Sequence, residues 1–199
     1  KGKVALIDPL TKGTYTDRFN QMAMHGDAAL RTAYEAQYGK PLETDLPSAS
    51  AAWLAAMGAN GPLMADGDDR VSEAVGAPGQ EAPFVGLLSS AKFRDNADKG
   101  YQLGLCTGLN PWVGWSYTKL GLIAAGTDSP NAARLFIHYV LTEEGIMPQM
   151  KDGKMPTSTA IALPSDEPSG LAAHLDALFP YDAATGLDDW DSRQDWQDF

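Results

Sequence analysis

The sequence predicts an α/β fold, from two short apolar strands and the helices between them. Residues 4–7 (VALI) and 84–88 (FVGLL) are continuous apolar runs, which is the pattern of strands buried on both faces. Asp8-Pro9 ends the first run and Ser89-Ser90 ends the second. Strands that alternate with helices in this way favour a mainly parallel sheet covered by helices on both faces.

The first helix is expected to begin near Thr14. Tyr15, Phe19, Met22 and Ala23 fall at i, i+4, i+7 and i+8, which is the apolar stripe of an amphipathic helix. Such a helix would point unpaired backbone N–H groups and the positive end of its dipole beyond the carboxyl end of the first strand. Ligands bind there in open α/β sheets. The alternative is that Thr14 only caps the helix.

Three more helices are expected before the second apolar run, each marked by capping residues at its start and glycine or proline at its end. Leu30, Ala33, Tyr34 and Tyr38 are expected to face inward on the first of them. Residues 42–46 are expected to form a short strand. The helices begin at Asp27, at Ser48 or Ser50, and at Asp68 or Asp69, and they end at residues 39–41, 58–61 and 76–79.

The second half of the chain is expected to hold two more strands and two more helices. The strands are residues 101–106 and 117–125, and a surface connection covers 147–170. One helix begins with Pro130 at its first position, and the other spans 171–178. The first of these helices is expected to bury Leu135, Phe136, Tyr139 and Val140, and the aromatic residues of the acidic end, Trp190, Trp196 and Phe199, are expected to dock on the body or on a missing segment.

Composition and charge limit the classes of protein to which this chain can belong. The 199 residues are 44% hydrophobic and 21% charged, as in an ordinary globular chain, and no segment reaches the ~18 consecutive apolar residues of a membrane span. The formal net charge of −11 argues against a nucleic-acid partner, because phosphate binding needs a basic patch. Much of this charge lies in residues 151–199, with ten Asp or Glu against three Lys or Arg.

Two stretches of the chain together match one family in order and separation. In residues 1–20, Lys-Gly-Lys-Val leads through an apolar strand and Asp-Pro to a Gly-Thr that opens a helix. Residues 129–136 (SPNAARLF) continue into 139–145 (YVLTEEG). These stretches resemble the start of the second lobe, and the helix that returns to the first lobe, in bacterial extracellular solute-binding proteins of ABC importers. The subgroup suggested serves ferric iron, phosphonates, sugar phosphates and polyamines.

The resemblance covers most of residues 1–150 and implies a type II periplasmic-binding-protein-like lobe. It assigns 1–106 to the α/β second lobe, 107–116 to the crossover between lobes, 117–150 to a return segment of the first lobe, and 151–199 to an acidic C-terminal extension. The abrupt start of the chain suggests a fragment or a processed product that lacks most of the first lobe. Another chain or copy would then cover the return segment. Periplasmic or extracellular localisation follows from the resemblance alone.

The expected ligand site lies at the carboxyl ends of the two strands. Backbone N–H groups near Gly13 would hold an anionic or hydroxyl-rich head group, and Lys12 would add a positive charge. Serine hydroxyls after the second strand would donate hydrogen bonds, and a tryptophan would line the cleft or pack between lobes. The candidate residues are Thr11, Lys12, Gly13, Thr14, Ser89, Ser90, Trp112 and Trp115.

Motifs for catalysis and metal binding were sought and not found in the sequence. His25, His138 and His174 lie in no zinc-binding arrangement, and no nucleophile elbow or nucleotide loop occurs. The single Cys106 excludes an internal disulfide and is expected to be a small core residue. Residues 188–191 lack the glycine and the distal glutamate of a calcium loop. No cofactor is therefore expected.

The sequence thus favours a solute-binding component that captures a phosphate ester or phosphonate and delivers it to a membrane permease. Ferric-binding members of the family carry adjacent tyrosines where this chain has Ser89-Ser90, so no tyrosinate iron site is expected here. A polyamine would need carboxylates at those positions. The remaining alternative is an α/β transferase or hydrolase with an unrecognised site, because fold does not fix function.

Overall fold

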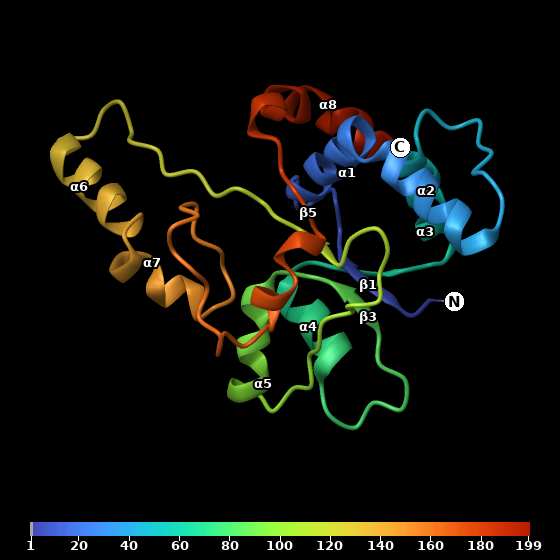
Figure 1. Ribbon diagram of the computed structural model, residues 1–199, viewed down its shortest axis with the longest axis horizontal. Coiled ribbons are helices and arrows are strands. Elements are labelled where there is room, and N and C mark those ends of the chain that lie inside the picture. Colours follow the sequence, from blue (N-terminus) through green and yellow to red (C-terminus); the bar gives the residue numbers. More distant parts are fainter. Residues whose placement is uncertain (1) are drawn as a thin grey trace.

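The computed structural model describes residues 2–199, as an α/β arrangement with a small parallel sheet (Figure 1). Four short 3₁₀ turns occur at Ser90–Arg94, Leu171–Ala173, Leu175–Ala177 and Ala183–Thr185. The strands are β1 (Val4–Ile7), β2 (Leu63–Ala65), β3 (Val85–Leu87), β4 (Gly114–Trp115) and β5 (Leu178–Phe179). The helices are α1 (Thr14–His25), α2 (Asp27–Tyr38), α3 (Ala49–Ala59), α4 (Asp68–Gly76), α5 (Asp95–Asp98), α6 (Pro130–Val140), α7 (Glu143–Met150) and α8 (Gly186–Asp198).

The main sheet has the strand order β2-β1-β3, with both pairings parallel. Ile7 of β1 lies beside Ala65 of β2, and Leu6 lies beside Leu87 of β3, so all three strands end at the same edge. The two apolar runs identified in the sequence are therefore confirmed as neighbouring strands. Strand β2 was not predicted, because its three residues are too few to form a recognisable strand pattern. A second sheet pairs β4 with β5, also in parallel.

The core forms where helices meet both faces of β1. Figure 1 shows α1 to α3 and α8 on one side of the sheet and α4 and α5 on the other. Ala5 and Ile7 are buried between Tyr15 and Phe19 of α1 and Val71 of α4. This close packing explains the glycine within β3. A Cβ on Gly86 would lie only 2.4 Å from the Val75 side chain, so α4 would have to move away.

The predicted start of α1 is confirmed, and so is its apolar stripe. The helix begins at Thr14, and Tyr15, Phe19 and Met22 are buried. Gly13 occupies the N-cap position without a side-chain bond, so Thr14 is the first helical residue and not the cap.

The boundaries of the next three helices agree with those predicted. Ser48 caps α3 by accepting the Ala51 N–H at 3.0 Å, α4 begins at Asp68, and the left-handed Gly39 ends α2 at φ 69°. In α2, however, no residue is buried, and Tyr38 is exposed.

Several expected elements are corrected by the structure. Residues 42–46, 101–106 and 117–125 form no strand, and 171–178 folds as two 3₁₀ turns that lead into β5. Within residues 101–106, the backbone of Leu103 forms hydrogen bonds with a side chain and not with a strand. The Asn96 side-chain amide accepts the Leu103 N–H and donates to the Leu103 carbonyl. Cys106 is exposed and not in the core.

The α6–α7 arm (residues 117–150) extends away from the sheet (Figure 1). Pro130 begins α6 as predicted, and His138 is exposed. The expected buried face is not covered within residues 2–199, because α6 has no buried residue there and its Leu135 and Phe136 are 70% and 67% exposed. None of the helices in residues 2–199 combines the length and apolar character that a bilayer crossing requires.

The C-terminal helix α8 lies along α1 through a mostly polar interface. Arg193 forms two hydrogen bonds with the buried Asp17, at 2.7 and 2.8 Å. Asp189 is buried and accepts hydrogen bonds from the side-chain amides of Asn20 and Gln21, each at 2.9 Å. Both oxygens of Asp189, in the acidic run considered for calcium, are thus occupied by protein donors.

The aromatic residues of α8 divide into docked and exposed groups. Trp196 packs against Phe19, with ring centroids 6.1 Å apart, and against Phe199. Trp190 stays 67% exposed beneath the guanidinium of Arg193. The expected docking on the body therefore holds for Trp196 and does not occur for Trp190 within residues 2–199.

Candidate functional site

The loop between β1 and α1 is held in a tight turn around Asp8. The Asp8 carboxylate accepts a hydrogen bond from the Leu10 N–H at 2.9 Å, and the backbone carbonyl of Asp8 accepts hydrogen bonds from the N–H groups of Thr11 and Lys12. The Thr11 hydroxyl also donates to the Asp8 carbonyl, at 2.8 Å. These bonds fix the segment between the end of β1 and the first turn of α1.

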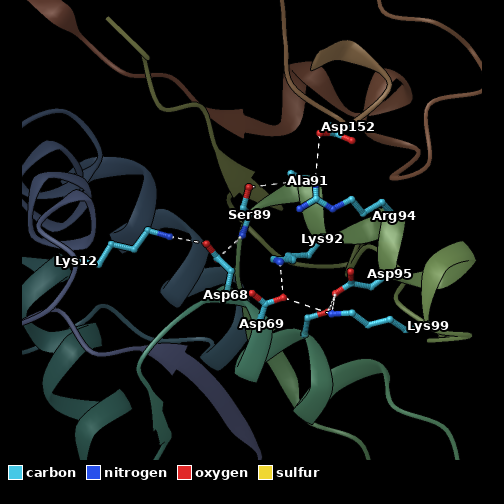
Figure 2. A network of polar contacts seen from close by, with 11 residues as sticks. Lys12, Asp68, Asp69, Ser89, Ala91, Lys92, Arg94, Asp95, Lys99 and Asp152 are labelled. Carbon is cyan, nitrogen blue, oxygen red and sulfur yellow. Dashed lines mark hydrogen bonds and ion pairs between the residues drawn. The ribbon is translucent and has the colours of Figure 1, made fainter. Parts of the chain in front are cut away.

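Asp68 joins the loops that follow all three strands of the main sheet. Lys12, after β1, contacts one oxygen of Asp68 at 2.8 Å, and the backbone N–H of Ser89, after β3, donates to the other at 2.9 Å. Asp68 itself is the first residue of α4, shortly after β2. Figure 2 shows its carboxylate between the two partners. The predicted residues Lys12 and Ser89 are therefore brought together, with the charge of Lys12 already paired.

Tyr15 ties the start of α1 to the same edge of the sheet. Its hydroxyl donates to the Leu87 carbonyl of β3 at 2.6 Å, and the Lys12 ammonium lies 5.7 Å from its ring centroid. Burial of the ring, with the negative charge of Asp68 nearby, raises the pKa of the Tyr15 hydroxyl well above its ordinary value. Tyr15 therefore stays neutral near pH 7 and acts as a hydrogen-bond donor.

A second set of ion pairs continues the network across α4 and α5. Asp69 pairs with Lys92 and Lys99, and Asp95 accepts a hydrogen bond from Lys99 at 3.2 Å (Figure 2). Asp95 also accepts a hydrogen bond from the Ser72 hydroxyl at 2.7 Å. The hydrogen bonds from Lys92 and Lys99 lower the pKa of Asp69 below its ordinary value. These charges fix the turn after β3 and leave Asp95 buried but paired.

The other predicted loop residues differ in how free they are to contact a ligand. A Cβ on Gly13 would meet the Arg193 guanidinium at 3.4 Å, so α8 lies over this glycine. Thr14 is half-buried at the first position of α1. Ser89 accepts the Ala91 N–H at 3.4 Å as a cap, and Ser90 donates to the Gly153 carbonyl at 2.7 Å. Both serine hydroxyls are thus engaged within the chain.

The two predicted tryptophans lie at opposite ends of α1. Trp112 packs on Phe179, with centroids 4.6 Å apart, and against Gly26 beyond the last turn of the helix. Trp115 instead meets the edge of Tyr15, with centroids 5.6 Å apart. Trp115 therefore belongs to the neighbourhood of Lys12 and Asp68, and Trp112 does not.

Arg18 and Asp68 are functional candidates that the sequence reasoning did not select. Arg18 is only 8% exposed, and its guanidinium carbon lies 4.2 Å from the ring centroid of Trp115. A signal for Arg18 exists in the sequence, because it falls three residues after Tyr15 and four before Met22, inside the apolar stripe of α1. Asp68 was expected only to begin a helix, since its place beside Lys12 depends on the undetected β2.

The side chains gathered here are suited to hydrogen bonding and charge pairing. Among the described residues, no group of three or more His, Cys, Asp or Glu side chains is arranged to hold a metal ion. The groups gathered at the strand ends are a tyrosine, an ion pair, backbone N–H groups and an arginine covered by tryptophan. No protein-family model, curated protein or solved structure matches this chain.

Proposed function

We propose that this chain is the solute-binding component of an ABC-type importer. In this proposal residues 1–106 form a type II periplasmic-binding-protein-like second lobe, and a small solute binds at the carboxyl ends of its strands. The protein works in the periplasm or outside the cell and delivers the solute to a membrane permease. The two stretches of sequence that resemble this family and the parallel sheet support this reading.

The observation that carries the proposal is the Asp68 junction. Lys12, Asp68 and Ser89 come from the loops after β1, β2 and β3, and Asp68 contacts Lys12 at 2.8 Å and the Ser89 N–H at 2.9 Å. In open parallel sheets a crevice at this edge is the usual ligand position. The junction holds three loops in fixed positions without using the hydroxyl of Thr14, so the start of α1 remains a candidate for ligand contact.

A phosphate ester or a phosphonate suits this edge best. The N-terminus of α1 favours a negative group, and Thr14 offers a hydroxyl at its first position. The carboxylate of Asp68 is occupied by Lys12 and by the Ser89 N–H, which leaves it less able to attract a polyamine. The exposed apolar residues of the α6–α7 arm fit a surface that a first lobe, another chain or a second copy covers.

A thermal-shift screen tests the proposed function. The probes are glycerol 3-phosphate, methylphosphonate, citrate, spermidine, ferric citrate and an uncharged sugar. A ligand that binds only the folded state raises the melting temperature. At one hundred times its Kd, such a ligand adds about 2.7 kcal/mol to the free energy of unfolding. Turnover of a model ester with no shift from any probe would contradict transport and favour an enzyme.

The Thr14→Val variant tests the position of the ligand. We expect the affinity for the probe that binds to fall by about 1 to 3 kcal/mol, the usual cost of an unpaired buried polar group. The free energy of unfolding should change little, because Gly13 and not Thr14 is the N-cap. Thr32→Val on the exposed face of α2 is the matched control. Equal affinities for the two variants in calorimetric titration would remove Thr14 from the site.

A further inference from the structure

Arg18 is a buried cation between two tryptophans. It lies on α1, one turn after Tyr15, and its guanidinium carbon is 4.2 Å from the Trp115 ring centroid and 5.9 Å from that of Trp53. Only 8% of the residue is exposed. Stacking of this kind is favourable, particularly out of water, but it provides no hydrogen-bond acceptor and no negative charge.

The polar groups of Arg18 lack partners among the described residues. Its Nε and Nη1 atoms are enclosed without a hydrogen bond, and so is the indole Nε1 of Trp115. These three atoms are the full set of enclosed, unpaired side-chain nitrogen and oxygen atoms in residues 2–199. All three are N–H donors, and they belong to two side chains in direct contact. The missing group is therefore an acceptor.

Arg193, which also contacts α1, differs from Arg18 in having a charged partner. Arg193 is partly exposed, yet it makes two hydrogen bonds with Asp17. Arg18 is more deeply buried and has no carboxylate partner, so burial lowers the pKa of its guanidinium to about 10. A buried charge is normally paired, and an unpaired one that persists needs a reason.

The position of Arg18 connects it to the candidate site. Trp115, which covers Arg18, packs on Tyr15, and the Tyr15 hydroxyl bonds to Leu87 at the end of β3. Lys12 is nearby, but its charge is neutralised by Asp68 at 2.8 Å. Arg18 is thus the cation of this neighbourhood that has no protein counter-ion. A guanidinium and an indole N–H both donate well to oxyanions.

We propose that Arg18, together with the indole N–H of Trp115, binds an oxyanion group of the solute. This inference rests on the proposed function and gives it a substrate class, namely molecules with a phosphate, phosphonate or carboxylate group. The oxyanion takes the place of the missing acceptor and counter-charge. Lys12 in turn holds the loops in place through Asp68 and does not neutralise the ligand.

Calorimetric titration of the full chain with glycerol 3-phosphate, methylphosphonate and citrate tests the proposal. Arg18→Met should weaken binding of the oxyanion probe by at least about tenfold, since a charge-assisted hydrogen bond is lost. Arg18→Lys should fall between Arg18→Met and the wild type, because it keeps the charge without the planar fork. Arg70→Met is the matched control, because Arg70 pairs with Glu73 on the exposed side of α4.

Trp115→Phe provides an independent variant that keeps an aromatic cover and removes the N–H. We expect this variant to bind the same oxyanion probe about three- to tenfold more weakly than wild type, with an unchanged circular dichroism spectrum. It keeps the proposal testable if Arg18→Met does not fold. An affinity for the oxyanion equal to that of wild type in Arg18→Met, or in both Arg18→Lys and Trp115→Phe, would overturn the assignment.

The outcomes separate this inference from the proposed function. If the wild-type protein binds spermidine or an uncharged sugar but no oxyanion, solute binding stands and the Arg18 assignment is wrong. If it binds none of the probes, the proposed function fails before the variants are compared. Selective loss of oxyanion binding in the Arg18 and Trp115 variants, with Arg70→Met unchanged, supports both.

Discussion

Helices α6 and α8 differ in both composition and packing: the apolar helix α6 is exposed, and the polar helix α8 is packed against α1. The α6 helix carries Leu135, Phe136 and Tyr139, yet none of its residues is buried. The α8 helix is rich in Asp and Gln, yet it lies along α1 in the most extensive helix–helix contact of the structure. Its buried residue is Asp189, a carboxylate.

The contrast shows that the partner, and not the polarity of a helix, decides whether it packs. On α1, Asp17, Asn20 and Gln21 offer a row of buried polar groups, and α8 supplies a matching donor or acceptor for each. An apolar helix has no such specific requirement, but it needs a surface to cover it. Within residues 2–199 that surface is absent for α6.

The largest difference in stability is expected when a phenylalanine is replaced in the packed region around α1 and α8 and, separately, on α6. Phe19→Ala empties a position that is 3% exposed, between β1, Trp53 and Trp196, and should lower the free energy of unfolding by about 3 to 5 kcal/mol. Phe136→Ala on α6 should change it by less than about 0.5 kcal/mol, since Phe136 is already exposed. Urea denaturation of both variants measures the two values. A cost for Phe136→Ala close to that of Phe19→Ala would mean that α6 is covered in solution, for example by a second copy.

A smaller effect is expected from the polar contacts themselves. Arg193→Met leaves the buried Asp17 without its counter-charge and should cost about 2 to 3 kcal/mol. This lies below the ~3 to 5 kcal/mol of a fully buried pair, because a third of the Arg193 side chain is accessible. Arg134→Met on α6 removes an exposed arginine that donates a hydrogen bond to Asn131, and it should be nearly neutral. Equal unfolding free energies for the two variants would show that the α1–α8 pairing adds no stability.

Local patterns allowed the sequence to predict the elements at the centre of the fold. The apolar stripe of α1 and the continuous runs of β1 and β3 are set by residues that are neighbours in the chain. The start of α3 was equally predictable, because Ser48 needs only the N–H of Ala51 to cap it. These features depend little on distant parts of the molecule.

Features that depend on distant partners were missed or wrongly placed. Residues 117–125 are apolar enough for a strand, but no neighbouring strand pairs with them. The pairing of Lys12 with Asp68 spans 56 positions, and it requires β2, which is too short and exposed to be identified from its own residues. Arg18 interrupts an apolar stripe, but its lack of an acceptor is visible only once Trp115 is seen to cover it.

The smallest predicted effect concerns the acid sensitivity of the packed helices. Asp27 of α2 accepts hydrogen bonds from the Ala49 N–H at 2.6 Å and from the Arg31 guanidinium at 2.7 Å, and these bonds lower the pKa of its carboxyl below its ordinary value. The stability that they contribute is therefore present above about pH 4 and is lost as pH falls through the lowered pKa. Asp27→Asn keeps an acceptor for Ala49 but loses the charge. Its deficit in unfolding free energy should be constant from pH 7 to 5 and shrink below pH 4, by less than about 1 kcal/mol because the carboxylate is a third exposed.

Arg31→Met is the internal control for this effect, because the Ala49 N–H is the larger cause of the lowered pKa. It should retain most of the acid dependence that Asp27→Asn removes. Unfolding free energies of the three proteins in urea, measured from pH 7 to pH 3, give the comparison directly. If the deficit of Asp27→Asn stays constant down to pH 3, Asp27 contributes no acid sensitivity. The link between α2 and α3 would then rest on the neutral hydrogen bond alone, unlike the charged pairing of α8 with α1.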